Sequence, residues 1–257
     1  VNVCQIPFWV LTVYYSWKIF NQKIPKFKDC IIVGIFAAGG FLSKYLFIYL
    51  LISIDLFFIY LIFFKKDRKF HFNYVFTLEV FCVLLIPHII WLFNNDFITI
   101  TYGLIRSSAD ASTILDHLLY PLIFVIKQVG ILIPFFVMFY FLTKKIKLNY
   151  SLKDKNLLFL LSINILPIVL ILLTSMLMGS KIRTMWMTPF YLFFGTLLVY
   201  IFQKYIKKNY KGFIISFLIL FLLSPITYAY VSITKTDKRT DYPGKQIAEK
   251  VQKKWNS

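Results

Sequence analysis

The chain is divided into apolar runs about as long as a membrane-spanning helix. A helix needs about 20 mostly apolar residues to cross the ~30 Å hydrocarbon core of a bilayer. The run at 30–64 is too long for one crossing, and Gly39-Gly40 with Ser43-Lys44 divides it. The spans expected from these runs are 1–17, 30–42, 45–64, 73–93, 119–143, 157–178, 187–203 and 212–231. Because a backbone in lipid must satisfy its own hydrogen bonds, the runs predict an all-α, polytopic transmembrane helical bundle.

Composition excludes a soluble globular domain. Hydrophobic residues make up 59% of the chain and charged residues 16%, against ~45–50% and ~25% in soluble domains. The net charge of +18 would suggest nucleic acid in a soluble protein. In a membrane protein, Lys and Arg first indicate orientation, because they collect in cytoplasmic loops. We therefore expect membrane lipids as partners and no nucleic acid.

Most basic residues lie in four short linkers, and two expected spans separate each linker from the next. The four linkers are 18–28, 65–69, 144–155 and 204–211. All four can be cytoplasmic together only if the chain crosses twice within 30–64. The opposite face then holds the break at 40–45, the loops 94–118 and 179–186, and the tail 232–257. We expect this tail to begin an exoplasmic C-terminal region.

Within the loop 94–118, Asn94-Asn95-Asp96 resembles a helix N-cap. Phe97, Ile98, Leu104 and Ile105 fall on one face of the helix that would follow. This pattern predicts an amphipathic helix lying in the outer membrane interface. The three cysteines lie in or beside apolar runs and have no metal-ligand spacing, so we expect buried free thiols, no metal and no cofactor.

Ionisable groups at the membrane edge are costly unless they are paired or hydrated, so they mark candidate sites. Outside the linkers and the tail, five basic residues remain, and four of them are candidate donor or phosphate ligands: Lys44, Arg106, Lys181 and Arg183. The fifth, Lys127, fits a structural pair as well as a site. The expected substrate cavity is lined by Tyr45, His88, Asp96 and Trp186. Arginine binds phosphate through two parallel hydrogen bonds, and this pattern favours an anionic amphiphile such as a lipid phosphate.

Simpler readings of these residues stay open. Lys44 also fits a side chain that reaches from a short helix to the headgroups, and His88 fits a hydrogen-bonded packing residue. Arg106, Asp110 and Asp116 also fit solvated loop charges. The cluster of Lys181, Arg183 and Trp186 also fits a lipid-headgroup anchor.

Three segments resemble those of polytopic lipid-linked sugar transferases. They are GIFAAGGFLSKYLFIYLL, IPHIIWLFNNDFITITYGL and GSKIRTMWMTPFYLFFG, and TDYPGKQIAEKVQKKW is similar to the start of the outer C-terminal region of these enzymes. The chain as a whole resembles GT-C glycosyltransferases of the protein-mannosyltransferase and aminoarabinose-transferase type (family 39-like). Lys44 corresponds to the lysine of that family and Asp96 to its loop acid, and Arg183 and Trp186 correspond to its basic-aromatic loop.

The resemblance implies transfer of a sugar from a polyprenyl-phosphate donor to a glycolipid, polysaccharide or protein acceptor. The enzyme would be an integral protein of a bacterial inner (plasma) membrane, with its active site facing the periplasm. In the family, an aspartate in the first outer loop activates the acceptor hydroxyl. We expect that loop upstream of Val1, in a longer protein of which this chain is an N-terminally truncated part. The catalytic residue therefore stays unassigned.

Two other functions remain open. A broken helix with an intramembrane lysine also suits a membrane transporter or flippase for an anionic amphiphile, which should show matching interruptions in two halves of the chain. The sequence shows one clear break, at 39–44. A non-catalytic membrane scaffold would leave the polar residues of the outer side unexplained.

Overall fold

The computed structural model describes residues 2–66, 69–107, 113–143, 153–203, 206–234 and 243–255. Every regular element in these ranges is helical, so the all-α polytopic bundle is confirmed. Among the described residues, five helices are long and apolar enough to cross a membrane: Tyr45–Phe64, Asn73–Asn94, Asp116–Thr143, Lys155–Met178 and Tyr210–Thr234. A sixth candidate is a pair of short helices, Thr184–Tyr191 and Phe194–Phe202, with a bend of 42° between them.

The chain forms two compact units, which we describe separately. Unit 1 comprises residues 1–132 and 147–204, and unit 2 comprises residues 133–146 and 205–257. Unit 2 contains the C-terminal part of α6 (Asp116–Thr143), together with α9 (Ile206–Thr234) and α10 (Gly244–Trp255). Within the described residues, α9 and α10 are each continuous, and α9 stays helical through Pro225.

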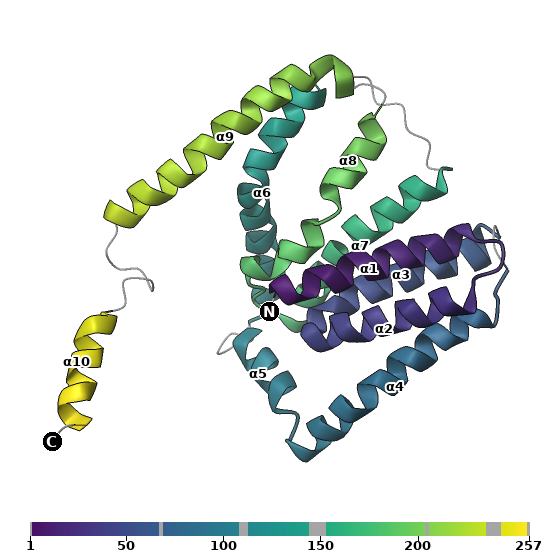
Figure 1. The fold of residues 1–257 in the computed structure, drawn as a ribbon, viewed down its shortest axis with the longest axis horizontal. Coiled ribbons are helices and arrows are strands. Elements are labelled where there is room, and N and C mark those ends of the chain that lie inside the picture. Colours follow the sequence, from purple (N-terminus) through teal and green to yellow (C-terminus); the bar gives the residue numbers. More distant parts are fainter. Residues whose placement is uncertain are drawn as a thin grey trace. The chain divides into compact units, whose positions relative to one another are not determined.

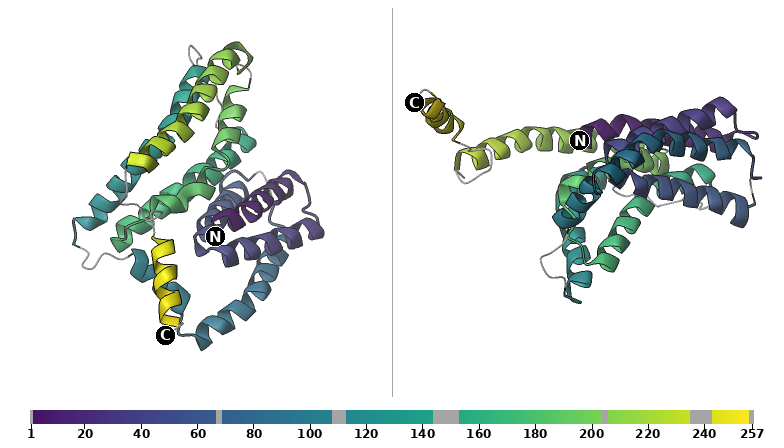
Figure 2. Two further views of the ribbon diagram at one scale, coloured as in Figure 1. Left: turned by 60° about the vertical axis from the view of Figure 1, so that its left-hand side comes forward. Right: turned by 90° about the horizontal axis from the view of Figure 1, so that it is seen from below.

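Unit 1 starts with a helical hairpin, α1 (Asn2–Asn21) and α2 (Phe27–Ser43), whose helices run side by side in every view (Figures 1 and 2). The next span consists of a 3-10 turn η1 (Tyr45–Phe47), α3 (Ile48–Ile59) and a π-helical turn η2 (Tyr60–Phe64). The remaining elements of the unit are α4 (Asn73–Asn94), α5 (Ile98–Ser107), the N-terminal part of α6, α7 (Lys155–Met178), η3 (Thr184–Tyr191) and α8 (Phe194–Phe202).

Close approach of α2 to its neighbours depends on small residues. A Cβ atom added at Gly34 would lie 2.7 Å from the carbonyl oxygen of Thr77 in α4. Added at Gly39 or Gly40, it would meet the ring of Phe8 or of Phe47. Small residues let helix backbones approach closely in membranes, where packing drives helix association. The glycine pair therefore lies inside α2 as a contact surface, and the break comes only at Lys44.

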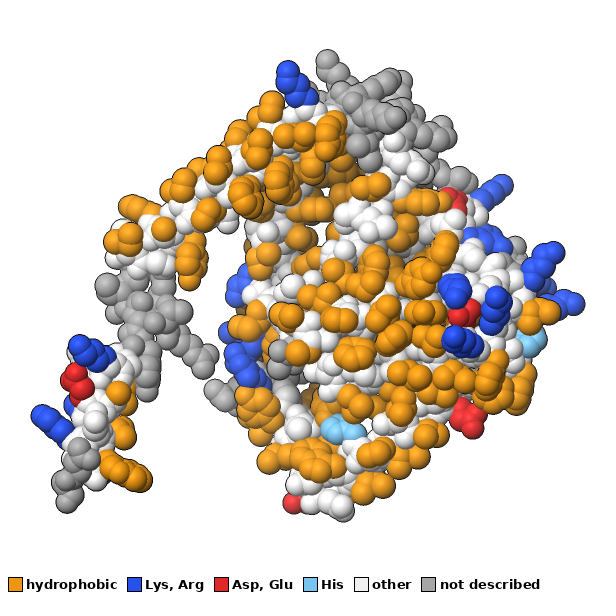
Figure 3. All heavy atoms as spheres, viewed as in Figure 1, with side chains coloured by type: hydrophobic (Ala, Val, Ile, Leu, Met, Phe, Trp, Pro, Cys, Tyr) orange, Lys and Arg blue, Asp and Glu red, His pale blue; other side chains and the backbone are white. Residues whose placement is uncertain are grey.

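An aromatic core fills the space between α1, α3, α7 and η3. Trp9 packs edge-on against Phe47 with ring centroids 5.4 Å apart, and its ring lies 5.1 Å from that of Phe190. All three side chains are almost fully buried. Outside this core, the helices of unit 1 expose mostly apolar side chains (Figure 3), as expected for surfaces that face lipid.

The prediction of three buried thiols was wrong for two of them. Cys30 is buried, whereas Cys4 and Cys82 are exposed. Cys82 lies on α4, whose described residues expose many apolar side chains. Apolar neighbours in the sequence therefore indicate contact with lipid as readily as burial in a protein core.

The helix ends of unit 1 gather into two groups. At one end, Trp17 donates to Asn156 (3.1 Å), Lys65 donates to the carbonyl of Lys153 (2.8 Å), and Tyr200 donates to Asp154 (2.7 Å). We call this group of helix ends the Lys65 end. Lys and Arg side chains cluster there, beside the end of α1 and the start of α2 (Figure 3).

Candidate functional site

The opposite group of helix ends contains seven of the eight candidate residues. It consists of residues 43–47, the turn 94–98, Arg106 and Ser107, and the loop 179–186; we call it the Lys44 end. His88 lies within reach of it near the end of α4.

Lys44 is the single residue between α2 and η1, and its backbone is extended (φ −168°, ψ 127°). Two bonds close the last turn of α2: Ser43 Oγ donates to the carbonyl of Gly39 at 2.8 Å, and the Lys44 amide donates to that of Gly40 at 3.2 Å. The chain resumes helical geometry at Tyr45. The break therefore projects one long basic side chain at the point where the span is interrupted.

The ammonium group of Lys44 has two neutral neighbours. Its Nζ donates a 2.6 Å hydrogen bond to Asn2 Oδ1 and lies 5.4 Å from the ring centroid of Trp186. Asn2 in turn donates from Nδ2 to the carbonyl of Met185 at 2.7 Å. These contacts join the start of α1, the break after α2 and the start of η3 around one cation.

Lys44 is half-buried, and burial lowers its pKa to about 8. Within the described ranges the structure has one ion pair, between Lys18 and Asp29 at the Lys65 end (2.8 Å). Burial opposes ionisation of Asp29, but hydrogen bonds from Lys18 and Gln22 hold the pKa of its carboxyl below the usual value. No described carboxylate forms an ion pair with Lys44. A cation with only neutral ligands in a partly desolvated place favours an incoming anion.

A hydrogen-bonded chain lies next to this cation. The hydroxyl of Tyr45 is 2.7 Å from His88 Nε2 and 2.8 Å from Thr99 Oγ1. His88 also stacks on Trp91, with ring centroids 5.9 Å apart and ring planes 11° from parallel. These hydrogen bonds link Tyr45, at the break after α2, to α4 and α5. His88 is therefore a hydrogen-bonded packing residue that also lies beside the candidate site.

The loop after α7 brings more basic residues to the same end. Gly179 has a left-handed backbone (φ 58°) that ends α7, and the amide of Lys181 then donates to the carbonyl of Ser107 at 2.8 Å. The side chains of Lys181 and Arg183 are exposed. Arg106, one residue before Ser107, is also exposed and donates to the hydroxyl of Tyr102 at 2.6 Å.

Asp96 lies in the turn between α4 and α5. Asp96 and Phe97 both have positive φ (49° and 53°), and the turn is closed by a 3.0 Å bond from the Phe97 amide to the carbonyl of Leu92. An N-cap residue normally has an extended backbone, so Asp96 does not act as the expected cap. The predicted helix nevertheless follows, as α5, and its apolar residues are exposed. Asp110, whose charge also fits a solvated loop, lies outside the described residues.

The structure thus brings Lys44 and Trp186 into direct contact, and Tyr45 and His88 into direct contact. The amide of Lys181 bonds to the carbonyl of Ser107, the residue after Arg106. Arg183 and Asp96 lie at the same end but do not contact the ammonium group of Lys44. Sequence reasoning missed Asn2 and Thr99. Both are ordinary polar residues without a motif: Asn2 lies at the start of the first apolar run, and Thr99 lies in the amphipathic segment of the loop 94–118.

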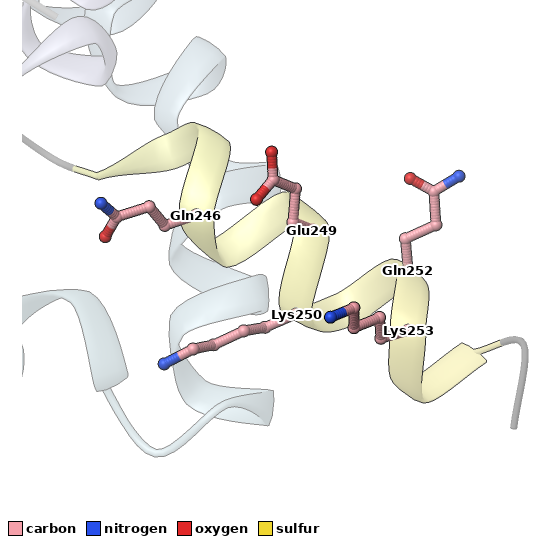
Figure 4. Close-up of a pocket in the computed structure, with 5 residues that line it drawn as sticks. All are labelled: Gln246, Glu249, Lys250, Gln252 and Lys253. Atoms are coloured by element: carbon pink, nitrogen blue, oxygen red, sulfur yellow. The ribbon is translucent and has the colours of Figure 1, made fainter.

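In the described ranges, no group of three or more His, Cys, Asp and Glu side chains could hold a metal ion. A surface hollow lies along α10 in unit 2, lined by Gln246, Glu249, Lys250, Gln252 and Lys253. Figure 4 shows that all five side chains project from this one helix, with no wall supplied by a second element. A hollow of this kind does not enclose a ligand.

Residues 1–91 match the family described as dolichyl-phosphate-mannose-protein mannosyltransferase. The matched part runs from the start of α1 into α4 and includes Lys44, Tyr45 and His88. Over these 91 of its 257 residues, the chain is similar to the protein mannosyltransferases of that family. No curated protein and no solved structure matches the chain.

Proposed function

We propose that this chain is the donor-binding part of an enzyme that takes a sugar from a polyprenyl-phosphate donor and transfers it to a hydroxyl acceptor on the exoplasmic side of a membrane. The acceptor would be a glycolipid, a polysaccharide or a protein, and the membrane a bacterial inner membrane. The resemblance to aminoarabinose and family 39 transferases supports this finer assignment. The match of residues 1–91 supports the coarser one, a membrane glycosyltransferase.

The observation that carries the proposal is the half-buried ammonium of Lys44. It lies at a break in a membrane span, its contacts are an amide oxygen and an aromatic face, and no described carboxylate pairs with it. The phosphate monoester or diester headgroup of a lipid is an anion that complements the charge of this ammonium group and lies at the membrane surface, where the break is expected. Lys181, Arg183 and Arg106 add positive potential at the same end.

The chemistry needs this positive charge. Breaking a sugar–phosphate bond leaves negative charge on the phosphate and positive charge at the anomeric carbon. A cation fixed in a poorly solvated site stabilises the developing negative charge without reorganising. A carboxylate must also take the proton of the acceptor hydroxyl. We assign that role to no residue of this chain, and propose Asp96 only as a substrate-cavity residue that orients a sugar hydroxyl.

One observation favours the alternative of a transporter or flippase for an anionic amphiphile. Besides the break at Lys44, the described residues contain the bent pair η3 and α8, and Trp186 of η3 contacts Lys44. Two interrupted helices meeting at a charged site is an arrangement that transporters also use. Translocation and transfer must therefore be measured separately.

The test is sugar transfer from a radiolabelled polyprenyl-phosphate sugar in proteoliposomes. We expect Lys44→Ala to lose about 10²–10³-fold in transfer rate, as enzymes do when a transition-state charge ligand is removed. The matched control is Lys28→Ala, an exposed lysine in a basic linker, which should retain the wild-type rate. Wild-type turnover in Lys44→Ala would refute the proposed role of Lys44. Translocation of a fluorescent lipid phosphate without any transfer by the wild type would favour the flippase.

A further inference from the structure

Five buried polar side chains of unit 1 have atoms without a hydrogen-bond partner among the described residues, and four of the five lie on α1 and α7. They are Gln5, Thr12 and Ser16 on α1 and Asn164 on α7, with exposed fractions of 0%, 0%, 2% and 0%. Asn164 donates from Nδ2 to the carbonyl of Leu160 at 2.7 Å, so only its Oδ1 is unpaired. Among the described residues, nothing bonds to either amide atom of Gln5, to the two hydroxyls, or to Asn164 Oδ1. Buried polar groups in proteins are nearly always hydrogen-bonded, to protein or to ordered water.

The two hydroxyls on α1 differ from others in the same chain. Ser43, Ser53 and Thr174 each donate to the carbonyl four residues earlier in their own helix, at 2.8, 2.6 and 2.9 Å. That bond is the usual way for a helical hydroxyl in an apolar environment to be satisfied. Thr12 and Ser16 do not make it, so their hydroxyls need a partner in the space between helices.

The unpartnered groups form a row. Gln5, Thr12 and Ser16 are separated by seven and four residues, a spacing that keeps them on one face of α1. The row is eleven residues long, about 16 Å at 1.5 Å per residue. Its outer member, Gln5, lies one turn along α1 from Asn2, which binds Lys44.

Asn164 lies at the depth of this row. Phe20 of α1 and Phe159 of α7 are in ring contact, 5.8 Å apart, near the Lys65 end. Counted outward from that contact, Asn164 is five residues away on α7, Ser16 four residues away on α1, and Thr12 eight. Val13 and Ile163, the neighbours of Thr12 and Asn164, belong to the same buried cluster. An unpaired carbonyl acceptor thus lies level with unpaired hydroxyl donors.

We propose that a row of internal water-binding sites lies along α1. The row begins one helical turn after Asn2 and continues into the part of unit 1 that lies inside the membrane. A buried water typically makes two to four hydrogen bonds to polar groups that lack other partners. The amide of Gln5, the hydroxyls of Thr12 and Ser16, and the carbonyl of Asn164 supply both donors and acceptors for it. This inference does not depend on the proposed transferase activity.

Radiolytic labelling in ¹⁸O-water tests the row directly, because hydroxyl radicals formed from bound water mark side chains beside it. Trp9 lies between Gln5 and Thr12 on the same face of α1 and is only 1% exposed. In the full chain in nanodiscs, we expect Trp9 to acquire ¹⁸O within milliseconds. Trp255, which is 87% exposed, is the positive control. Labelled Trp255 with unlabelled Trp9 would overturn the proposal.

Apolar variants of nearly the same shape provide the second arm. In Thr12→Val combined with Gln5→Leu we expect the label on Trp9 to be lost, whereas Ser53→Ala, whose hydroxyl is already satisfied, should keep it. Thr12→Val and Ser16→Ala alone should each lower the thermal unfolding temperature, because each removes a partner from a bound water. If both raise it, the hydroxyls are dry and the row of water sites does not exist.

Discussion

At the scale of single residues, Lys44 makes the proposed reaction sensitive to pH. Burial lowers its pKa to about 8, so the ammonium form predominates below that pH and is lost above it. Because the donor phosphate needs the cation, transfer should fall as the pH rises through about 8. The measurement is the pH dependence of sugar transfer in proteoliposomes.

Lys44→Arg separates this effect from other titrations. The guanidinium stays charged far above this range, so the fall should move to higher pH, even if the absolute rate drops because the geometry at Asn2 and Trp186 changes. Identical pH profiles for the wild type and Lys44→Arg would show that another group controls the rate.

Tyr45 supports a second prediction at this scale, because its hydroxyl connects α4 and α5. Tyr45→Phe removes the contacts to His88 and Thr99, each worth about 0.5–1.5 kcal/mol. The bond from Lys181 to Ser107 remains at the other end of α5. We expect faster amide hydrogen exchange in Ile98–Ser107, measured by mass spectrometry. Tyr60→Phe, at an exposed position near the other end of the same span, is the control, and unchanged exchange in α5 after Tyr45→Phe would contradict the prediction.

Residue-level reasoning proposed Lys44, Tyr45, His88 and Trp186 because charged and amphipathic side chains at a membrane edge are costly and therefore informative. The structure brings them into contact in two pairs, and their role at a site stays a prediction. Residue-level reasoning could not find Asn2 or Thr99, since an asparagine or threonine beside apolar residues is common and has no motif. Their roles depend on which helix ends meet, and that is a property of the tertiary structure.

At the scale of helices, Gly34 controls the packing of α2 against α4. A Cβ atom there would lie 2.7 Å from the Thr77 carbonyl oxygen and 2.9 Å from Val80 Cβ, so Gly34→Ala must push the helices apart. We expect a loss of about 1–3 kcal/mol in unfolding free energy, as for other overpacked sites. Gly130→Ala is the matched control, because nothing lies within 4 Å of its added Cβ and alanine favours a helix by up to about 1 kcal/mol. Thermal unfolding in detergent compares them, and equal stability of the two variants would contradict the prediction.

Asp55 weakens the insertion of its own span. It lies near the middle of Tyr45–Phe64 and is exposed on α3, between the exposed Ile52 and Ile59. On the insertion scale, replacing aspartate by leucine at a helix centre is worth about 3–4 kcal/mol. Asp55→Leu should therefore raise the inserted fraction of residues 45–64 in a glycosylation-based insertion assay, whereas Ile52→Leu should not. An unchanged inserted fraction would show that Asp55 lies outside the hydrocarbon core.

Sequence reasoning works well for the existence of helices, because a backbone in lipid has few alternatives to a helix. It was less successful with their interruptions. The glycine pair at 39–40 indicated a break, yet α2 continues through it because Phe8 and Phe47 pack against the bare backbone. The bend between η3 and α8 was not predicted, because the run 187–203 was interpreted as one span although it contains Pro189 and Gly195.

At the scale of the whole molecule, the three exoplasmic segments expected in unit 1 meet at one end of it. The break at Lys44 contacts Trp186, the loop 179–186 bonds to Ser107, and His117 at the start of α6 lies 2.6 Å from the carbonyl of Met176 near the end of α7. The basic linkers described in this unit meet at the other end. This separation agrees with the topology expected from the basic linkers, in which two spans separate each linker from the next. That topology groups the helix ends but does not assign either group to the cytoplasm.

Cysteine labelling determines that sidedness. Replacing Cys4, Cys30 and Cys82 gives a background without thiols, and single cysteines then report on the turn after α4 (Asn95→Cys), a basic linker (Lys23→Cys) and α10 (Gln252→Cys). All three positions are exposed. Because Lys and Arg collect in cytoplasmic loops, a membrane-impermeant maleimide should label positions 95 and 252 in intact cells, and position 23 only after permeabilisation. The reverse pattern at 95 and 23 would place Lys44 on the cytoplasmic side and exclude the exoplasmic transfer proposed here. Protection of 252 alone would leave the Lys44 end outside and assign only the basic tail to the cytoplasm.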